Sequence, residues 1–329
     1  MALSRNSKSL AALMFTAFGR IGQLGRDQSL AAIRLMHAHF APDAVLALPI
    51  AEYLGVPLVT TCHGSDITVS DWNIFRAGKI SGLRYLLQRK DLLSYGARFI
   101  AVSDFLKQRM IDAGYPADKV VRHYVGVDTT RFVPLEASRN SVDHAPYVLS
   151  VARHSDVKGL DTLIKAFARV VARHPELRLV QIGDGELMPR LKSLAADHGL
   201  EDRIEFLGAR RPQDVLWYMQ RCRLLVLSSR RSLNGAEESF GLVLAEAAAC
   251  GIPCVATLVG GIPEAVVAGQ TGCLVPPDDV GALSDAIDGL IGCPDLAAAM
   301  GRRAREMVRD CFDLHRQTGQ LERIYDEVA

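Results

Sequence analysis

Short apolar runs alternate with longer amphipathic stretches along most of the chain. In the second half, six runs rich in aliphatic and β-branched residues are separated by stretches whose apolar residues recur every three or four positions. The runs are typical of buried strands and the stretches are typical of helices that cover them. The predicted strands are Tyr147–Ala152, Arg178–Ile182, Ile204–Leu207, Leu224–Leu227, Pro253–Thr257 and Cys273–Val275, and the predicted helices are Leu160–Arg173, Glu186–His198, Pro212–Arg221, Gly241–Cys250 and Ile262–Ala268. The pattern predicts an α/β domain with a doubly wound parallel sheet, whose ligands lie beyond the carboxyl ends of the strands.

The first half shows the same alternation with fewer units. Its predicted strands are Arg34–His39, Leu58–Cys62, Arg98–Val102 and Val120–Tyr124, and its predicted helices are Ala44–Leu54, Ile80–Tyr95 and Asp104–Ala113. The residues before Arg34 have a helical pattern and supply no opening strand followed by a glycine-rich turn. We therefore expect an incomplete parallel-sheet domain in this half.

The domain boundaries follow from the linker and from the end of the chain. A polar segment bounded by Pro134 and Pro146 has the composition of a hinge. We expect an N-terminal domain over residues 1–140 and a C-terminal domain over residues 141–294. After Pro294 the pattern is helical to the end, about Asp295–Val328, which is longer than the second sheet needs, so residues 295–329 form a third segment.

Composition excludes several classes of protein. The chain has 329 residues, of which 49% are hydrophobic and 23% charged, and a formal charge of +1. This balance is unlike that of disordered, collagen-like or simple nucleic-acid-binding chains, and no apolar run is long enough to span a bilayer. The charge is uneven, at +6 for residues 1–140 and −5 for the rest. The basic half suits an anionic partner, either phosphate or a membrane face, although drift between solvated surfaces gives the same figures.

The cysteines and the start of the chain indicate a cytoplasmic protein. There are seven cysteines, an odd number, without a CxxC pair, which favours reduced thiols. Cys250 and Cys254 flank a turn, where a metal or redox role is the less favoured alternative. The first residues lack a convincing signal-peptide cleavage site.

The segment Glu237–Gly251 holds the richest chemistry. Glu238 precedes the helix predicted from Gly241, and the amides at such a helix start suit a phosphate that approaches closely beside a glycine. Glu246 lies about 7.5 Å along the helix axis from Gly241, among aliphatic residues. A carboxylate there must find hydrogen-bond donors, such as sugar hydroxyls or, alternatively, backbone amides of a neighbouring loop.

Two basic residues follow the first strand of the second half. Arg153 lies at the strand's carboxyl end, and Lys158 comes just before the next helix. Such a pair can hold a diphosphate, although alone it is more often a solvated loop. The next strand ends in Gly183-Asp184-Gly185-Glu186, a turn that needs positive φ but lacks the third glycine of a dinucleotide fingerprint.

Histidines gather at the first half's strand ends. His63 follows a predicted strand in the run TTCHGSD and is suited to contact a substrate or transfer a proton, whereas a structural role is the default for an isolated histidine. His37 and His39 form an HxH pair for which spacing supplies no third ligand, so no metal site is expected.

Together these residues resemble the retaining glycosyltransferases of family 4. The most specific match is the pair of glutamates with seven residues between them, Glu238 and Glu246, within ESFGLVLAEAAACGIPCVA. Supporting matches are VARHSDVKGLDTLIKAF, IGDGE, IEFLGARRPQDV, GGIPEAV, GCLVPPDD, HGSD and the Gly126–Phe132 run, and the resemblance covers about residues 34–329. It implies a GT-B fold, in which two Rossmann-like domains face a cleft, and HAHF with HGSD most resembles transferases of bacterial exopolysaccharide and lipopolysaccharide assembly.

The resemblance also implies the role of each site residue. Arg153 and Lys158 would bind and stabilise the leaving diphosphate, with the Gly241 and Leu242 amides near the phosphates. Glu238 would contact the donor sugar and Glu246 the ribose, while His63 would face the sugar from the first domain. Such enzymes use no divalent metal or other cofactor, because these groups neutralise the diphosphate.

The expected function is transfer of a hexose, with retention, from a nucleotide-diphosphate sugar to a saccharide or lipid-linked acceptor at the inner membrane face, with no nucleic-acid partner. The family's first domain normally opens with a strand and a glycine-rich loop, which the pattern lacks here. The alternative is therefore a shortened, catalytically impaired member that only binds nucleotide sugar. An epimerase or phosphorylase of the same architecture is less favoured, since no lysine motif for pyridoxal phosphate is present.

Overall fold

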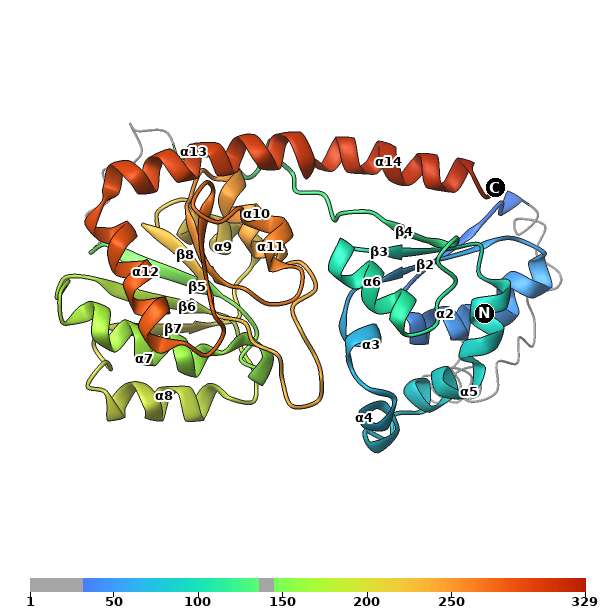
Figure 1. Cartoon of the computed structure of the whole chain (residues 1–329), viewed down its shortest axis with the longest axis horizontal. Helices are drawn as coiled ribbons and strands as arrows, with labels where there is room; N and C mark the ends of the chain where they lie inside the picture. The colour runs from blue at the N-terminus through green and yellow to red at the C-terminus, as the bar shows by residue number, and fades with distance from the viewer. Residues whose placement is uncertain (1–31, 136–144) are drawn as a thin grey trace, which may run out of the picture. The chain divides into compact units, whose positions relative to one another are not determined.

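In the computed structural model, which describes residues 32–135 and 145–329, the chain forms two α/β units, each built on its own parallel sheet (Figure 1). The first unit contains the described residues up to Tyr124 together with 234–236 and Gly319–Ala329. The second unit contains Val125–Leu233 and Glu237–Thr318. The division after Tyr124 falls earlier than the boundary at residue 140 that the sequence suggested.

The second unit has a six-stranded parallel sheet, as predicted. Its strands are β5 (Tyr147–Val151), β6 (Arg178–Ile182), β7 (Ile204–Gly208), β8 (Leu224–Leu227), β9 (Cys254–Thr257) and β10 (Gly272–Val275), in the order β10-β9-β8-β5-β6-β7. The order reverses at β5, which pairs with β6 on one side and with β8 on the other. The loops that follow β5 and β8 therefore diverge, and in such sheets the crevice between them is the usual ligand site.

Helices cover both faces of this sheet (Figure 1). They are α7 (Leu160–Val171), α8 (Met188–Asp197), α9 (Pro212–Met219), α10 (Leu242–Ala249), α11 (Ile262–Ala265) and α12 (Val280–Gly292), with a 3₁₀ turn, η4, at Asp156–Lys158. The sequence pattern did not predict α12. Leu163, Ile164 and Phe167 of α7 are buried at three- and four-residue spacing against the strands and α12. On the opposite face α10 packs against β8, β9 and the later helix α13 (Pro294–Cys311).

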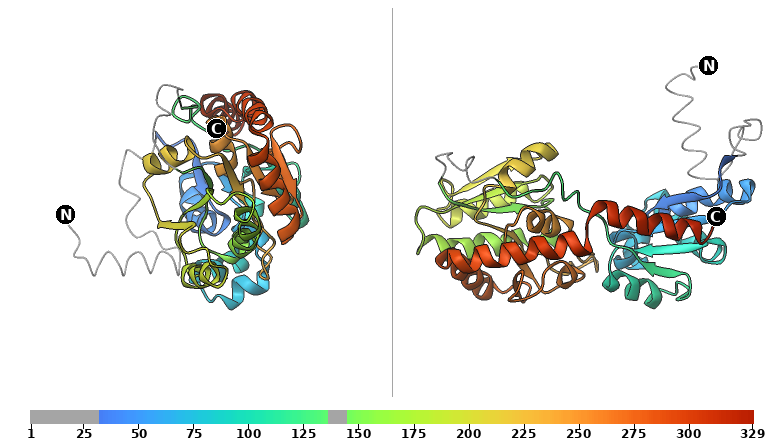
Figure 2. Two further views of the ribbon diagram at one scale, coloured as in Figure 1. Left: turned by 90° about the vertical axis from the view of Figure 1, so that its left-hand side faces the viewer. Right: turned by 90° about the horizontal axis from the view of Figure 1, so that it is seen from above.

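The C-terminal segment is two helices rather than the single one expected over Asp295–Val328. The long helix α13 (Pro294–Cys311) runs across the second unit (Figure 2), and α14 (Leu314–Asp326) follows it. The break arises because Val127 donates to the Phe312 carbonyl at 2.7 Å and accepts from the Leu314 amide at 2.9 Å. These bonds remove Phe312 and Leu314 from the regular helical pattern, so the helix ends and restarts there.

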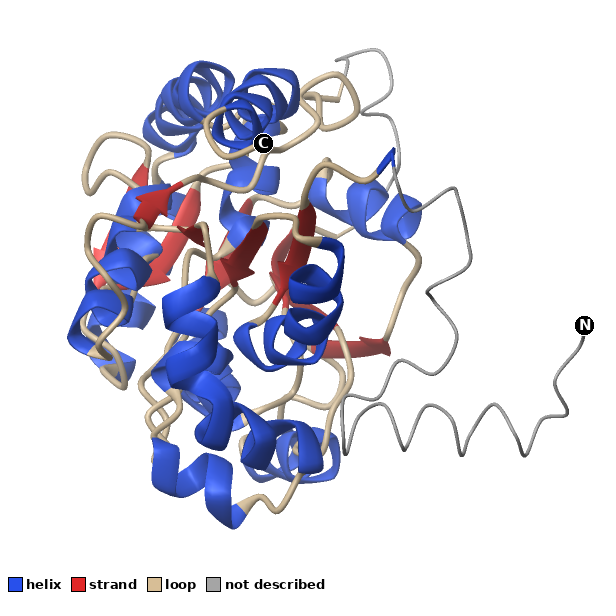
Figure 3. Cartoon of the chain, turned by 90° about the vertical axis from the view of Figure 1, so that its right-hand side faces the viewer, coloured by secondary structure: helices blue, strands red, loops and turns tan. Residues whose placement is uncertain are grey.

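The described part of the first unit has a four-stranded parallel sheet in chain order (Figure 3). Its elements are β1 (Met36–His39), α2 (Ala41–Leu54), β2 (Leu58–Cys62), α3 (Ser65–Thr68), α4 (Asp71–Arg76), α5 (Ile80–Tyr95), β3 (Arg98–Ala101), α6 (Asp104–Asp112) and β4 (Val120–Arg122). The four predicted strands and three predicted helices are confirmed, while α3 and α4 were not predicted. The expectation that the residues before Arg34 supply no strand falls almost wholly outside the described residues.

None of the described helices is long and apolar enough to cross a bilayer.

Candidate active site

Most of the predicted site residues lie at the switch point of the second unit's sheet. Arg153 and Lys158 are on the loop that follows β5, and Glu238 is on the segment between β8 and α10. Gly241, Leu242 and Glu246 belong to α10 and its N-cap. The sheet topology thus puts these two groups on adjacent strands, β5 and β8, which pair directly.

Glu238 and Lys158 form an ion pair through the Glu238 Oε2 and Lys158 Nζ atoms. The same carboxylate oxygen accepts a hydrogen bond of 3.1 Å from Ser229 Oγ, and Ser229 is fully buried. No described residue donates to the other oxygen, Oε1, which remains available to a ligand hydroxyl. Ser229 was not predicted from the sequence. Its position just beyond the carboxyl end of β8, where ligands of such sheets bind, could have indicated it.

Arg230 fastens the turn that carries Lys158. Its guanidinium lies 2.7 Å from Asp156, 3.1 Å from Asp161 and 3.0 Å from Asp278. Its Nε also donates to the Asp156 carbonyl at 3.0 Å. These contacts join η4 to the start of α7 and to the loop after β10, so one arginine fixes three backbone segments beside Lys158.

The backbone of Glu238 is packed against Gly260. Gly260 has φ of +58°, and a Cβ there would lie 1.9 Å from the Glu238 carbonyl oxygen, which also accepts from the Gly261 amide at 2.9 Å. Only glycine satisfies both the conformation and the approach. The family match of the GGIPEAV run gave no indication of this role for Gly260.

The helix α10 begins without a side-chain cap. Its N-cap is Gly241, at φ of 81°, so the first backbone amides of the helix have no side-chain partner and are suited to an anion. A Cβ on Gly241 would lie 2.9 Å from Leu244 Cδ1, on the core side. The glycine is therefore needed for its conformation, and not, as the sequence suggested, only for close approach of the anion.

Glu246 lies half-buried in the second turn of α10. No described residue hydrogen-bonds to its carboxylate, so the alternative that it caps a neighbouring loop is wrong for the described residues. Burial raises the pKa of Glu246 to about 7, and the charge of Arg131 offsets part of this effect. The carboxylate is therefore poorly satisfied until donors reach it.

Arg153 is exposed, and its guanidinium has no partner among the described residues. The backbone around it is held by the turn after β6, where the His154 amide donates to the Asp184 carbonyl at 2.9 Å. Gly183 has φ of 134° in that turn, which confirms the predicted need for positive φ. The backbone of this loop is therefore held in place, whereas the guanidinium of Arg153 can bind an anion.

In the first unit, His63 belongs to a row of stacked histidines at the carboxyl ends of β1 and β2. His63 Nε2 lies 2.9 Å from His39 Nδ1, and the His37 and His39 rings stack with centroids 4.6 Å apart. Burial lowers the pKa of His63, helped by His39 and opposed by Asp66. The sequence did not anticipate that His39 contacts His63.

Asp66 fixes the backbone that presents His63. Its buried carboxylate accepts from the amides of His63 at 3.1 Å, Gly64 at 2.8 Å and Ala41 at 3.0 Å. These bonds join the loop after β2 to the start of α2. The HGSD run thus contains, in Asp66, the residue that holds the loop carrying His63.

The HxH pair has structural partners. His37 Nδ1 lies 2.6 Å from the Tyr325 hydroxyl and His37 Nε2 lies 2.7 Å from Thr61 Oγ1. Within residues 32–135 and 145–329, no group of three or more His, Cys, Asp or Glu side chains is arranged to hold a metal ion. All seven cysteines are free thiols, and burial raises the pKa values of Cys250 and Cys254 to about 12, which makes both unreactive.

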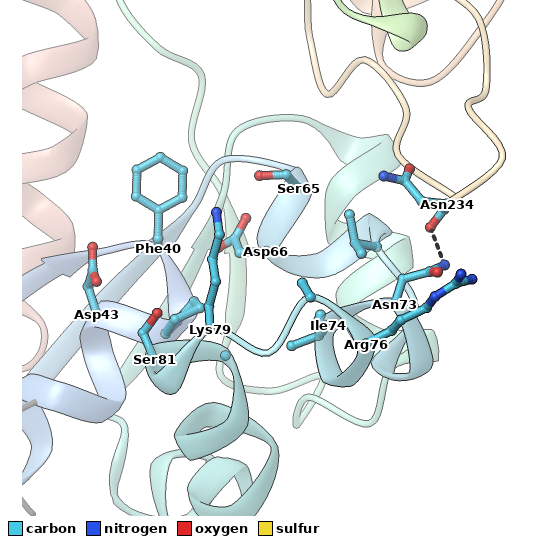
Figure 4. Close-up of a pocket in the computed structure, with 14 residues that line it drawn as sticks. Phe40, Asp43, Ser65, Asp66, Asn73, Ile74, Arg76, Lys79, Ser81 and Asn234 are labelled. Carbon is cyan, nitrogen blue, oxygen red and sulfur yellow. Dashed lines mark hydrogen bonds between the residues drawn. The ribbon is translucent and has the colours of Figure 1, made fainter. Parts of the chain in front are cut away.

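A pocket of about 670 Å³ opens beside the Asp66 loop, within the first unit (Figure 4). Asp66, Phe40 and Lys79 line one part of it, and Asn73 and Asn234 line another. Its polar and charged side chains suit a hydroxylated ligand.

Two parallel-sheet units, one with carboxylates and cations at its switch point, define a glycosyltransferase of the GT-B fold, and comparison with known proteins supports this class. The solved structure of HepE from Anabaena in complex with UDP and glucose matches with a TM-score of 0.77 and 25% identity, over 91% of this chain and 79% of that one. Sucrose-phosphate synthase from Thermosynechococcus elongatus matches with a TM-score of 0.73 and 25% identity, over 89% and 73% of the two chains.

The chain belongs to the group 1, family 4 glycosyltransferases. The family model for glycosyl transferases group 1 matches residues 135–307, and that for glycosyltransferase family 4 matches residues 6–131. The second match begins earlier than the resemblance seen from the motifs alone, which started at about residue 34.

Three relatives of the chain are named for different compounds. N-acetyl-alpha-D-glucosaminyl L-malate synthase of Bacillus anthracis is 30% identical over 304 residues, which are 89% of this chain and 74% of the relative. WcaL of Escherichia coli (strain K12), named for colanic acid biosynthesis, is 32% identical over 84% of this chain and 66% of the relative. A GDP-mannose-dependent phosphatidylinositol monomannoside mannosyltransferase of Mycolicibacterium smegmatis is 29% identical over 82% of this chain and 70% of the relative.

Proposed function

We propose that this glycosyltransferase moves a hexose from a nucleotide-diphosphate sugar to a saccharide acceptor, free or lipid-linked, with retention at the anomeric carbon, in the synthesis of a bacterial surface polysaccharide. The observation that carries the proposal is the group of unsatisfied polar functions at one switch point. These are the free cation of Arg153, the uncapped start of α10, the open Oε1 of Glu238 and the bare carboxylate of Glu246. A nucleotide sugar has a complementary part for each of them.

Each group has a defined task in this proposal. Arg153, Lys158 and the Gly241 and Leu242 amides bind the diphosphate and stabilise the charge that grows on it as the bond to the sugar breaks. Glu246 accepts hydrogen bonds from the ribose hydroxyls. Glu238 uses Oε1 to hold a hydroxyl of the sugar.

The reaction forms one bond for each bond it breaks. The bond between the anomeric carbon and the diphosphate oxygen breaks, and an acceptor hydroxyl attacks the same face of that carbon. The acceptor's proton passes to the departing phosphate oxygen, and the products are the glycoside and a nucleoside diphosphate. His63, held by His39 and Asp66, contacts the sugar during the transfer.

We further propose that no divalent metal takes part, because two cations and a helix start supply the charge that a metal would otherwise supply. The pocket of the first unit is the proposed acceptor site. HepE, solved with UDP and glucose, and the mannosyltransferase relative that uses GDP-mannose support the donor class.

The test is incubation of the full chain with UDP- and GDP-hexoses and saccharide acceptors, with and without EDTA. We expect release of nucleoside diphosphate that depends on acceptor, is unaffected by EDTA and gives a product of unchanged anomeric configuration by NMR. Glu238→Gln should abolish transfer, whereas Glu306→Gln, on an exposed face of α13, should not. Donor binding by calorimetry without turnover by any donor–acceptor pair would refute transfer and support a protein that only binds nucleotide sugar.

A further inference from the structure

A second cavity lies at the edge of the second unit's sheet that is opposite the proposed donor site. Its volume is about 740 Å³, and the described residues that line it all belong to this unit. They include the residues that directly precede four of the strands, Pro146 before β5, Leu177 before β6, Arg223 before β8 and Pro253 before β9. The cavity therefore lies at the amino ends of the strands, about 16 Å from the carboxyl end of the five-residue strand β5. We call it the amino-edge pocket.

The lining of the amino-edge pocket is strongly basic. Its charged residues are one acid, Glu176, and four arginines, Arg221, Arg223, Arg302 and Arg305. Four positive charges and one negative charge give the lining a formal charge of +3. This excess is local, because residues 141–329 together have a formal charge of −5. The pocket thus concentrates positive charge within an acidic part of the chain.

Two of the four arginines already have hydrogen-bond partners. Arg305 donates to the carbonyl of Ala249, the last residue of α10, and burial lowers the pKa of Arg305, helped by the charge of Arg309. Arg221 donates to the Trp217 carbonyl at 3.0 Å, and its guanidinium lies 4.4 Å from the centroid of the Trp217 ring. The buried Nε of Arg221 has no hydrogen-bond partner among the described residues. Neither guanidinium pairs with a carboxylate in the described part of the chain.

The other two arginines are available to a ligand. Arg223 and Arg302 are exposed, and neither pairs with any residue that the structure describes. Glu176 is also exposed and pairs with none of the described residues, so it does not neutralise them. Between these charges the lining is apolar and includes Leu177 and Ile252. A ligand that fits must therefore combine negative charge with a body that tolerates apolar walls.

From this combination we infer that the amino-edge pocket binds a small phosphorylated compound, at a site separate from the proposed donor site. The planar fork of a guanidinium matches the oxygens of a phosphate group, and one phosphate monoester, with close to two negative charges, offsets both Arg223 and Arg302. The volume is within the roughly 300–1,000 Å³ that is typical of small-molecule sites. The pocket shares no residue with the proposed donor and acceptor sites, so the inference does not depend on the proposed function.

Tryptophan fluorescence gives a direct test, because Trp217 lies against Arg221 and the only other tryptophan of the chain is Trp72. In the full chain with Trp72→Phe, all tryptophan emission comes from beside the pocket. We expect inorganic phosphate, glucose 6-phosphate and AMP to change this emission until it saturates, whereas glucose leaves it unchanged. High salt should weaken the response. The probe that binds most tightly identifies the body of the ligand, and equal affinities would mean that the phosphate group alone is recognised.

Variants of the charged lining should change the affinity in opposite directions. Arg223→Gln with Arg302→Gln should weaken the binding of the tightest probe about 100-fold, at about tenfold for each charge-assisted hydrogen bond. Glu176→Gln removes the acid of the lining and should strengthen binding about threefold. The matched control, Arg190→Gln with Lys192→Gln, removes two exposed charges from α8 and should bind as the parent does. An unchanged circular dichroism spectrum shows that each variant is folded.

Other results would overturn the inference. The absence of an emission change with all three probes would refute the site, and equal loss of binding in the α8 control would mean that only net charge matters. Arg153→Gln removes a cation of the proposed donor site and should leave the Trp217 response unchanged. Loss of the response in that variant would mean that the probes bind at the donor site instead. If the probes bind at the pocket but no nucleotide sugar is turned over, the proposed function fails and the second site stands.

Discussion

Lowering the pH from about 8 to about 6 should weaken the binding of a nucleotide sugar about tenfold, through Glu246 alone. Burial raises the pKa of its carboxylic acid to about 7, against the charge of Arg131. The carboxylate is then about 90% ionised at the upper pH and about 10% at the lower. Only the ionised form accepts hydrogen bonds from both ribose hydroxyls, so binding at the lower pH must first release about one proton.

Calorimetry measures both quantities. Titration of the full chain with a nucleotide sugar, in two buffers of different ionisation enthalpy, gives the dissociation constant and the number of protons released. A nucleotide sugar is the right probe, because its diphosphate is esterified at both ends and lacks a terminal phosphate group with a pKa of about 6. Glu246→Gln should bind more weakly at the higher pH and lose the dependence on pH, whereas Glu306→Gln should keep it.

The same shift has a consequence for folding. Because the pKa of Glu246 is raised above its unfolded value of 4.5, the empty protein should lose stability as the pH rises from about 4.5 to about 7, and Glu246→Gln should not show that loss. A dissociation constant that is equal at the two pH values in the parent protein would refute the reasoning. So would an unchanged pH dependence in Glu246→Gln, since another group would then be titrating.

Three further outcomes test the positioning contacts of the site. Ser229→Ala removes the 3.1 Å hydrogen bond to Glu238 Oε2 and should lower kcat/KM about tenfold in a steady-state transfer assay. It should also lower the free energy of unfolding by about 1 kcal/mol. The control is Ser284→Ala at a buried serine whose hydroxyl bonds within α12, which should leave kcat/KM unchanged. Gly260→Ala places a Cβ 1.9 Å from the Glu238 carbonyl oxygen and should abolish donor binding by calorimetry, whereas Gly269→Ala, with φ of +72° and open space around it, should affect stability without affecting binding. His39→Asn removes a neighbouring charge and should raise the pKa of His63 toward its ordinary value, measured by NMR titration of the imidazole protons.

Each of these has a result that contradicts it. Full transfer activity in Ser229→Ala would mean that Lys158 alone holds Glu238. Equal donor affinity in the two glycine variants would mean that the loop can move without harm. A His63 pKa that does not rise in His39→Asn would mean that His39 does not lower it.

The strands of the second unit and its helices other than α12 were predictable, because its buried strands are short, aliphatic and separated by amphipathic helices. All six strands were found at their predicted places, and Arg153 and Lys158 were correctly set after the first of them. Short elements such as α3 and α4 escaped prediction, because four to six residues do not establish a helical period. The single predicted C-terminal helix failed at Phe312, since its break depends on bonds to Val127, far away in sequence.

The sequence by itself determined the family, the two carboxylates and the two cations, because these depend on residue type and on spacing along one strand or helix. Only the tertiary structure decided what holds them. Lys158 and Glu238 are eighty residues apart and meet because β5 and β8 are neighbours. Ser229, Gly260 and Arg230 act through hydrogen bonds and close approaches between such distant segments, and no local pattern encodes a contact of that kind.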